Sequence, residues 1–144
     1  MTAKALGLVP VLPRYADEQL AERLGIEIDV CRPDLVVGTI PVHGNRQPIG
    51  IMHGGANAAF AETLGSLAAW MHAGADRIVA GLELSCTHHR PAREGRVTGV
   101  CRPLHVGSTT ATYEIVLTDE EGRRTCTARL TCALPPAPRG AKRD

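Results

Sequence analysis

The sequence predicts an α+β fold in which a curved antiparallel sheet wraps around one long central helix. The helix is expected at Ile51–His72, a stretch without proline that is rich in alanine and leucine and has glycines near its start. Apolar and polar residues alternate before and after this stretch, a pattern typical of half-buried strands. One helix cannot cover both faces of a parallel sheet, so we expect the strands to be antiparallel.

Short elements are expected before the central helix. The acidic start of Ala16–Leu24 and the glycine that follows it predict a short helix. Ile26–Val30 alternates between apolar and acidic side chains and predicts a strand, which a turn at Arg32–Asp34 joins to a returning strand at Leu35–Val42. A polar loop, His43–Gly50, then leads to the helix.

Four strands are expected in succession after the helix, at Ile78–His89, Arg96–Val106, Thr109–Thr118 and Arg123–Leu134. Alternation in the first of them places Gly81 on the face opposite to Leu82 and Leu84. Alternation in the last places Cys126 and Cys132 on one face with apolar neighbours. We therefore interpret the cysteines as small core residues.

The composition indicates one domain with an aliphatic core, because 44% of the 144 residues are hydrophobic but only 3% are aromatic. We expect this domain at 15–134. Prolines without any periodicity predict a flexible arm at 1–14, and a charged, proline-rich stretch predicts a disordered tail at 135–144.

Charge and cysteine content argue against several classes of protein. The formal net charge is +1 without a dense Lys and Arg cluster, which does not support nucleic-acid binding. The start lacks the apolar core of a secretory signal, and no apolar run is long enough to cross a membrane. Five cysteines without zinc-ribbon spacing fit a disulfide framework poorly. We expect a cytoplasmic protein with neither a membrane nor a nucleic acid as partner.

The central helix separates into two faces at about 100° per residue. One face is a large apolar stripe of Phe60, Leu64, Leu67 and Met71. The other face holds small residues and one charge, and consists of Gly55, Ala58, Glu62, Gly65, Ser66 and Ala69. A solvent-facing side would carry several charges, so we expect the helix to be covered nearly all round. A covered carboxylate is costly unless it is paired, which makes Glu62 the leading candidate for chemistry; a structural ion pair with an arginine is the alternative.

A zinc site is an alternative use of Cys86, His88 and His89. Neighbouring residues on a strand point to opposite faces, so the two histidines would not readily bind one ion. No second pair of ligands has the spacing to complete such a site. We therefore expect no metal.

Three segments in this order resemble a known family. They are HGGANAAFAETLGS (His53–Ser66), the stretch Val79–Ser108 with its HHRP and PLHVG motifs, and Tyr113–Thr131. They resemble the hotdog-fold acyl-CoA thioesterases of the HGG...E (PaaI-like) branch, which includes the enterobactin proofreading thioesterases and the 1,4-dihydroxy-2-naphthoyl-CoA thioesterases. The resemblance spans roughly Leu24–Leu134 and implies the hotdog fold.

The resemblance implies a thioesterase acting on acyl-CoA or on an acyl carrier protein, with sites between the subunits of a homodimer, often paired into a homotetramer. The position that matches the family's nucleophile or general base is Glu62. The N–H of Gly54 would donate to the thioester oxygen at the helix N-terminus, and Gln47 and His53 would contact or orient the carbonyl region. Ser66, one turn beyond Glu62, would hold water or touch the acyl group; ordinary helix packing is the alternative.

The positions that match the family's contacts to coenzyme A are Gly81, His88, His89, Arg90, Pro91, His105, Val106, Gly107 and Ser108. The coenzyme A thioester is the substrate, and no cofactor is expected. The leading substrates are thioesters of aromatic acids, of the 1,4-dihydroxy-2-naphthoyl-CoA or benzoyl type, or of short acyl groups. The alternatives are proofreading of a misloaded aryl carrier protein, a non-catalytic acyl-CoA-binding hotdog protein and a hotdog dehydratase.

Overall fold

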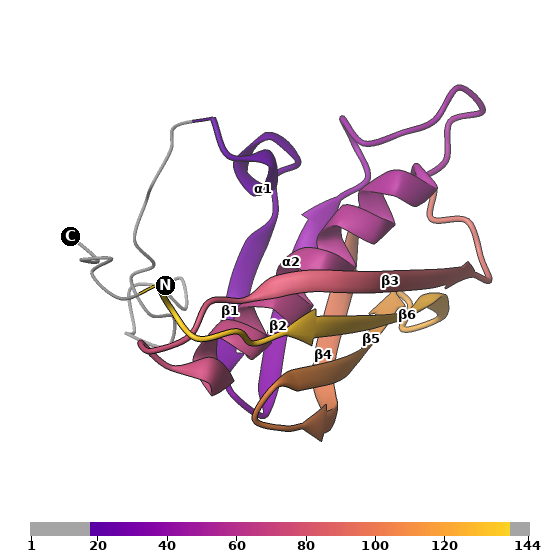
Figure 1. Cartoon of the computed structure of the whole chain (residues 1–144). Helices are drawn as coiled ribbons and strands as arrows, with labels where there is room; N and C mark the ends of the chain where they lie inside the picture. The colour runs from indigo at the N-terminus through magenta and orange to yellow at the C-terminus, as the bar shows by residue number, and fades with distance from the viewer. Residues whose placement is uncertain (1–17, 139–144) are drawn as a thin grey trace.

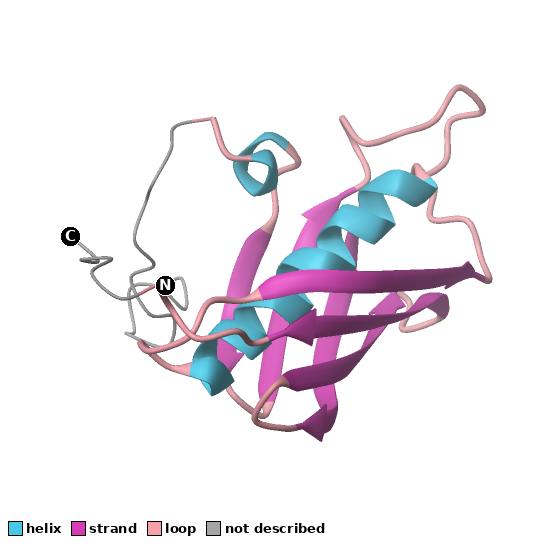
Figure 2. Cartoon of the chain, in the orientation of Figure 1, coloured by secondary structure: helices cyan, strands magenta, loops and turns pink. Residues whose placement is uncertain are grey.

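The computed structural model describes residues 18–138, and over these residues a six-stranded sheet curves around one long helix (Figure 1, Figure 2). The helices are α1 (Leu20–Arg23) and α2 (Gly54–Ala73). The strands are β1 (Glu27–Arg32), β2 (Leu35–Pro41), β3 (Ala80–His88), β4 (Arg96–Val106), β5 (Thr110–Thr118) and β6 (Arg124–Ala133). This arrangement confirms the α+β fold that the sequence predicts.

The sheet has the strand order β1-β2-β4-β5-β6-β3, and every neighbouring pair is antiparallel. After β2 the chain crosses the sheet as α2 and returns as β3 at the far edge (Figure 1). Most residues of β3 are exposed, because this strand pairs only with β6. No helix within residues 18–138 is long and apolar enough to cross a membrane.

The strands begin and end within two residues of their predicted bounds, and β4 matches them fully. The helices differ more. α2 begins at Gly54, three residues after the predicted start, because His53 caps it from an extended conformation. The predicted first helix was too long: α1 begins at Leu20, and Glu18 has a φ of 58°, in the left-handed region.

The two ends of the chain are described only in part. The predicted arm at 1–14 and residues 139–144 of the predicted tail lie outside the described residues. The segment before β3 holds the first residues of that tail, since Ile78 N donates to Pro135 O at 3.0 Å and Ala137 N to Asp76 O at 2.8 Å. The expected disorder therefore does not begin at Pro135.

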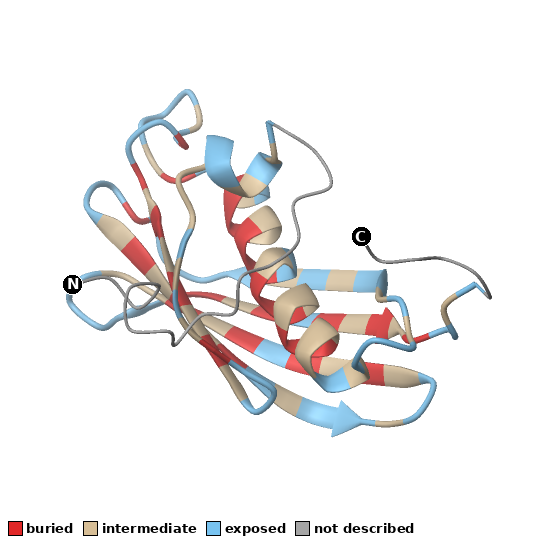
Figure 3. Cartoon of the chain, turned by 90° about the vertical axis from the view of Figure 1, so that its left-hand side faces the viewer, coloured by how far each residue is buried: buried red, intermediate tan, exposed pale blue. Residues whose placement is uncertain are grey.

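α2 buries one stripe along its length against the sheet (Figure 3). The buried residues of the helix are Ala56, Asn57, Phe60, Ala61, Leu64, Gly65, Ala68 and Ala69. Phe60 and Leu64 lie in this stripe as expected. Gly65 and Ala69 were expected on the opposite side with Glu62, but they are buried as well, because the curved sheet contacts more of the helix than a flat one would.

Two glycines allow the helix and the sheet to approach each other closely. A Cβ atom on Gly99 of β4 would lie 2.5 Å from Leu64 Cδ1 and 2.9 Å from Phe60 Cε1. A Cβ atom on Gly65 would lie 2.5 Å from Leu130 Cδ2. Both distances are shorter than packed carbon atoms tolerate, so a side chain at either position would push the helix away from the sheet.

The cysteines lie in the core, as the sequence predicts. Cys31, Cys101, Cys126 and Cys132 are buried, and Cys86 is half-buried. Burial raises the pKa of the Cys101 and Cys126 thiols to about 12, so both are protonated at neutral pH. These thiols therefore lack the thiolate that a cysteine nucleophile needs.

The close contact at Gly99 can be tested by substitution. Gly99→Ala should lower the free energy of unfolding by about 1–3 kcal/mol, because the added methyl group overpacks the contact with Leu64 and Phe60. Urea denaturation followed by circular dichroism measures the change. Thr98→Ala, on the other face of the same strand, is the matched control and should cost less than about 1 kcal/mol. Equal losses in the free energy of unfolding for the two variants would contradict the proposed close packing at Gly99.

Candidate active site

The loop before α2 is held in place by a buried asparagine. Asn45 is 8% exposed, and its side-chain amide donates to Leu24 O and Pro41 O, both at 2.8 Å. The backbone carbonyl of Asn45 accepts from His53 N at 2.8 Å. Asn45 thus ties the loop, the end of β2 and the start of α2 together, a role that the sequence did not single out.

His53 satisfies most of the backbone donors in the first turn of α2. Its Nδ1 accepts from Gly55 N at 2.8 Å, and its carbonyl accepts from Ala56 N at 3.0 Å and Asn57 N at 3.2 Å. The N–H of Gly54 has no acceptor among residues 18–138. An unpaired N–H at a helix N-terminus favours an anion or a polarised oxygen, because the helix dipole adds to its partial positive charge.

His88 lies against this N-terminus. A Cβ atom on Gly54 would be 3.1 Å from His88 Nε2 and 3.3 Å from His88 Cε1, so glycine at this position makes room for the imidazole. His88 Nδ1 is 3.3 Å from Asn57 Nδ2, whereas His89 Nε2 is 2.9 Å from Thr127 Oγ1. The two histidines thus point to opposite faces of β3, as expected of neighbours on a strand.

Metal ligands do not gather elsewhere either. Across residues 18–138 no three side chains of His, Cys, Asp or Glu lie close enough together to hold an ion.

Glu62 is exposed in the single chain, so the described residues of its own chain do not supply the expected covering of this face of α2, which stays a prediction. The Glu62 carboxylate lies beside the edge strand β3 and is accessible to water in the single chain. Glu62 forms no ion pair with an arginine in the described part of the chain. The described residues therefore do not provide the structural ion pair that was the alternative role for Glu62.

Gly81 faces Glu62. A Cβ atom on Gly81 would lie 2.9 Å from Glu62 Oε1. The predicted alternation put Gly81 on the opposite face from Leu84, but β3 has an irregular register between Gly81 and Glu83, which shifts the alternation by one residue. The missing side chain at Gly81 is what allows the edge strand to approach the carboxylate.

Gly54 and Glu62 are far apart within one chain. Glu62 lies eight positions after Gly54 on α2, which at about 1.5 Å per residue amounts to about 12 Å along the helix axis. One carbonyl group cannot contact both the Gly54 N–H and the Glu62 carboxylate of the same chain over such a distance.

The remaining predicted catalytic residues surround these two. Ser66 is half-buried one turn beyond Glu62. Its neighbour Thr63 donates its hydroxyl to Ala59 O at 2.7 Å, so that hydroxyl is already used within the helix. Gln47 is half-buried in the loop before α2, where its backbone N–H donates to Ile51 O at 2.8 Å.

The predicted contacts to coenzyme A divide into two groups. His88–Pro91 follows β3 at the end of the sheet where β6 begins, and His105–Ser108 follows β4 at the end where β6 finishes. Gly81 lies at the second end. There the loop is fastened to the helix, because His72 Nε2 lies 3.1 Å from Gly107 O and donates to it. One chain therefore does not bring the two groups together.

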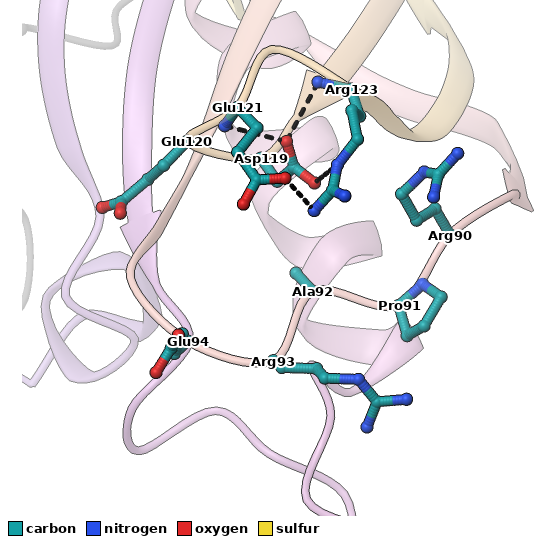
Figure 4. Close-up of a pocket in the computed structure, with 9 residues that line it drawn as sticks. All are labelled: Arg90, Pro91, Ala92, Arg93, Glu94, Asp119, Glu120, Glu121 and Arg123. Atoms are coloured by element: carbon teal, nitrogen blue, oxygen red, sulfur yellow. Dashed lines mark hydrogen bonds and ion pairs between the residues drawn. The ribbon is translucent and has the colours of Figure 1, made fainter.

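A pocket of about 480 Å³ lies beside the first group, between the segment 90–94 and the β5–β6 turn at 119–123 (Figure 4). Arg123 forms ion pairs with Asp119 and Glu121 in that turn. Arg90 and Arg93 have no ion pair with any residue that the structure describes. Figure 4 shows the Arg93 guanidinium directed away from the turn, so it is free to meet an anion from solvent.

The sequence is similar to known thioesterases over most of its length. The family model described as Thioesterase superfamily matches residues 49–126. A protein named proofreading thioesterase EntH from Cronobacter turicensis is 48% identical over 116 residues, which are 80% of this chain and 85% of the relative. One from Klebsiella pneumoniae is 45% identical over 120 residues, 83% of this chain and 88% of the relative.

Solved structures agree with the sequence comparison. A thioesterase from Haemophilus influenzae has a TM-score of 0.81 and 34% sequence identity, covering 88% of this chain and 89% of its own. A mutant thioesterase from Pseudomonas aeruginosa has a TM-score of 0.79 and 35% identity, covering 83% of this chain and 88% of its own. The chain therefore belongs to the Thioesterase superfamily, has the hotdog fold and is a thioester hydrolase.

Proposed function

We propose that this enzyme hydrolyses acyl-CoA thioesters at a site in which the Gly54 N–H of one copy and the Glu62 carboxylate of another act on the same carbonyl. The observation that carries the proposal is the pair of unpartnered groups on α2. The Gly54 N–H has no acceptor and the Glu62 carboxylate has no ion-pair partner within residues 18–138. They lie about 12 Å apart along one helix.

Gly54 is suited to stabilise the oxyanion. When water or a carboxylate attacks a thioester, the carbonyl oxygen gains negative charge, and a fixed N–H donor with a helix dipole behind it stabilises that charge. The other first-turn donors near it are already used by His53. Among residues 18–138, the Gly54 N–H is therefore the first-turn backbone donor that remains for the carbonyl oxygen.

Glu62 supplies the attacking or proton-accepting group. As a general base it would take a proton from water while the water oxygen bonds to the carbonyl carbon, and the thiol would leave with a proton. As a nucleophile it would form an anhydride that water then hydrolyses. Both routes need only water as the second reactant, so no cofactor is required, and Ser66 is placed one turn away to hold that water.

A second copy would bring the separated groups together. The edge strand β3 is mostly exposed, with Leu82 62% exposed, and such an edge is a natural place for another strand to pair. Antiparallel pairing of two β3 edges about a two-fold axis places the His88 end of one strand beside the Gly81 end of the other. Gly81 lies against Glu62, and His88 lies against Gly54. The same pairing would therefore bring Glu62 of one copy towards Gly54 of the other.

The same pairing supports a coenzyme A site shared by two copies. His88–Pro91 of one copy would approach His105–Ser108 of the other, which one chain keeps at opposite ends of its sheet. Arg90 and Arg93 have guanidinium groups without ion-pair partners in the described residues, which suits phosphate groups. A homodimer follows from this arrangement, and a homotetramer of two such dimers remains part of the proposal.

The proposed acyl group of the substrate is either aromatic, of the 1,4-dihydroxy-2-naphthoyl-CoA or benzoyl type, or short. A second candidate is the removal of wrong acyl groups from an aryl carrier protein. The identity of 48% to a protein named as a proofreading thioesterase supports this candidate. The catalytic residues would be the same, because both substrates present the same thioester.

Thiol release from a panel of acyl-CoAs tests the substrate class. The purified protein should release thiol faster from benzoyl-, hydroxybenzoyl- and dihydroxynaphthoyl-CoA than from linear acyl-CoAs. Glu62→Ala should lower kcat/KM on the order of 10³-fold or more, because it removes the nucleophile or base. Glu114→Gln, which removes another exposed carboxylate on β5, away from the proposed pairing edge, is the matched control and should keep wild-type activity.

Two results would change this assignment. Wild-type activity in correctly folded Glu62→Ala would remove Glu62 from the mechanism. Thiol release from a misloaded aryl carrier protein without release from any acyl-CoA would favour the proofreading candidate.

The role of the Gly54 N–H is tested by proline and alanine at the same position. Gly54 is the first residue of α2, where proline is tolerated, and the extended backbone of His53 suits a residue before proline. Both variants add a Cβ atom against His88, but only Gly54→Pro removes the N–H. Gly54→Pro should lower kcat by about 10²–10³-fold more than Gly54→Ala does. Equal activities of the two folded variants would show that this N–H does not act on the substrate.

A further inference from the structure

Asn57 is a buried polar residue in the first turn of α2, on the side that faces β3. Only 6% of its surface is exposed, and its Nδ2 lies 3.3 Å from His88 Nδ1. Its Oδ1 is buried without a hydrogen-bond partner among residues 18–138. A buried amide with an unpaired atom is costly, and the contact with His88 is the side-chain hydrogen bond that offsets part of this cost.

The contact with Asn57 determines which nitrogen of His88 carries the proton. If Asn57 Nδ2 donates, His88 Nδ1 is the acceptor and the proton of the neutral ring is on Nε2. The reverse assignment, in which Oδ1 accepts from Nδ1–H, would leave both amide N–H groups of Asn57 unpaired in a buried site. The first arrangement leaves one N–H and the oxygen unpaired, and it is favoured because orphaned buried N–H groups are rarer than orphaned oxygens.

The His88 ring then carries its Nε2–H next to Gly54. His88 Nε2 is the ring atom closest to the position that a Cβ on Gly54 would take, at 3.1 Å. The distances to its neighbours Cε1 and Cδ2, 3.3 and 3.6 Å, place the face of the ring over Gly54. The Nε2–H is therefore not aimed into the helix, and it has no partner among the described residues.

We propose that Asn57 is a positioning residue that fixes His88 as the Nε2–H tautomer, so that Nε2–H and the Gly54 N–H form a pair of donors for the thioester oxygen. The inference rests on the proposed function, because it takes the Gly54 N–H as the oxyanion donor. In this arrangement the tautomer of the imidazole depends on an amide 31 residues away in the sequence.

The tautomer can be read directly by long-range ¹H–¹⁵N correlation spectra of the ¹⁵N-labelled wild-type protein, with His88→Gln used to assign the His88 signals. At a pH where the ring is neutral, His88 should be the Nε2–H tautomer. Asn57→Asp should convert it to the Nδ1–H form, because a carboxylate only accepts. An Nδ1–H tautomer or an equal mixture in the wild-type protein would overturn the proposal. The wild-type spectrum decides this even where the variant does not fold.

Kinetics test the effect on the reaction. Asn57→Asp should lower kcat on the order of 10²-fold with little change in KM, because the misplaced proton weakens a donor used in the transition state. In a His88→Gln background the same substitution should have little further effect, because Asn57 acts through His88. Full additivity of the two losses would contradict a role through His88.

The His88 tautomer and the thioesterase activity test the role of Asn57 and the proposed reaction separately. An Nε2–H tautomer that depends on Asn57 in a protein without any thioesterase activity would support the fixed imidazole and refute the proposed reaction. Thioesterase activity that depends on Glu62 and Gly54, combined with an Nδ1–H tautomer of His88, would support the reaction and refute the role of Asn57.

Discussion

His53 makes two kinds of hydrogen bond at the first turn of α2: its ring accepts from Gly55, and its carbonyl accepts from Ala56 and Asn57. This cap leaves the Gly54 N–H as the first-turn donor without an acceptor in residues 18–138. The proposed chemistry depends on that remaining donor. The cap depends in turn on Asn45, which fixes the preceding loop to β2 and to the chain just after α1.

Close approach between α2 and the strands gives the same site its shape. Gly99 and Gly65 allow α2 to pack closely on the sheet, and this close packing sets the distance between the helix and the strands. Gly81 and Gly54 act at the edge, where the missing side chains leave room for the Glu62 carboxylate and the His88 ring. The core and the site are therefore parts of one packing arrangement, and among the described strands β3 is the one left most exposed.

Much of this could be predicted from the sequence, because the signals are local. Proline-free helix formers marked α2, alternation marked the strands, and the single carboxylate on a face of small residues singled out Glu62. The exposure of Glu62 in the single chain could not be predicted, since the pattern of a helix does not tell whether its own chain or another copy covers a face. The orientation of Gly81 was wrong because alternation does not reveal a register shift. Asn57 was missed because its partner, His88, is distant in the sequence.

Mixed oligomers test the shared site most directly. Glu62→Ala and Gly54→Pro chains with different tags are produced together, and the assemblies that carry both tags are purified. A mixed dimer would contain one site with an intact Gly54 N–H and an intact Glu62 carboxylate from different copies. It should recover about half of the wild-type activity per dimer, although each variant alone is nearly inactive. Mixed assemblies as inactive as the parent variants would contradict a site shared between two copies.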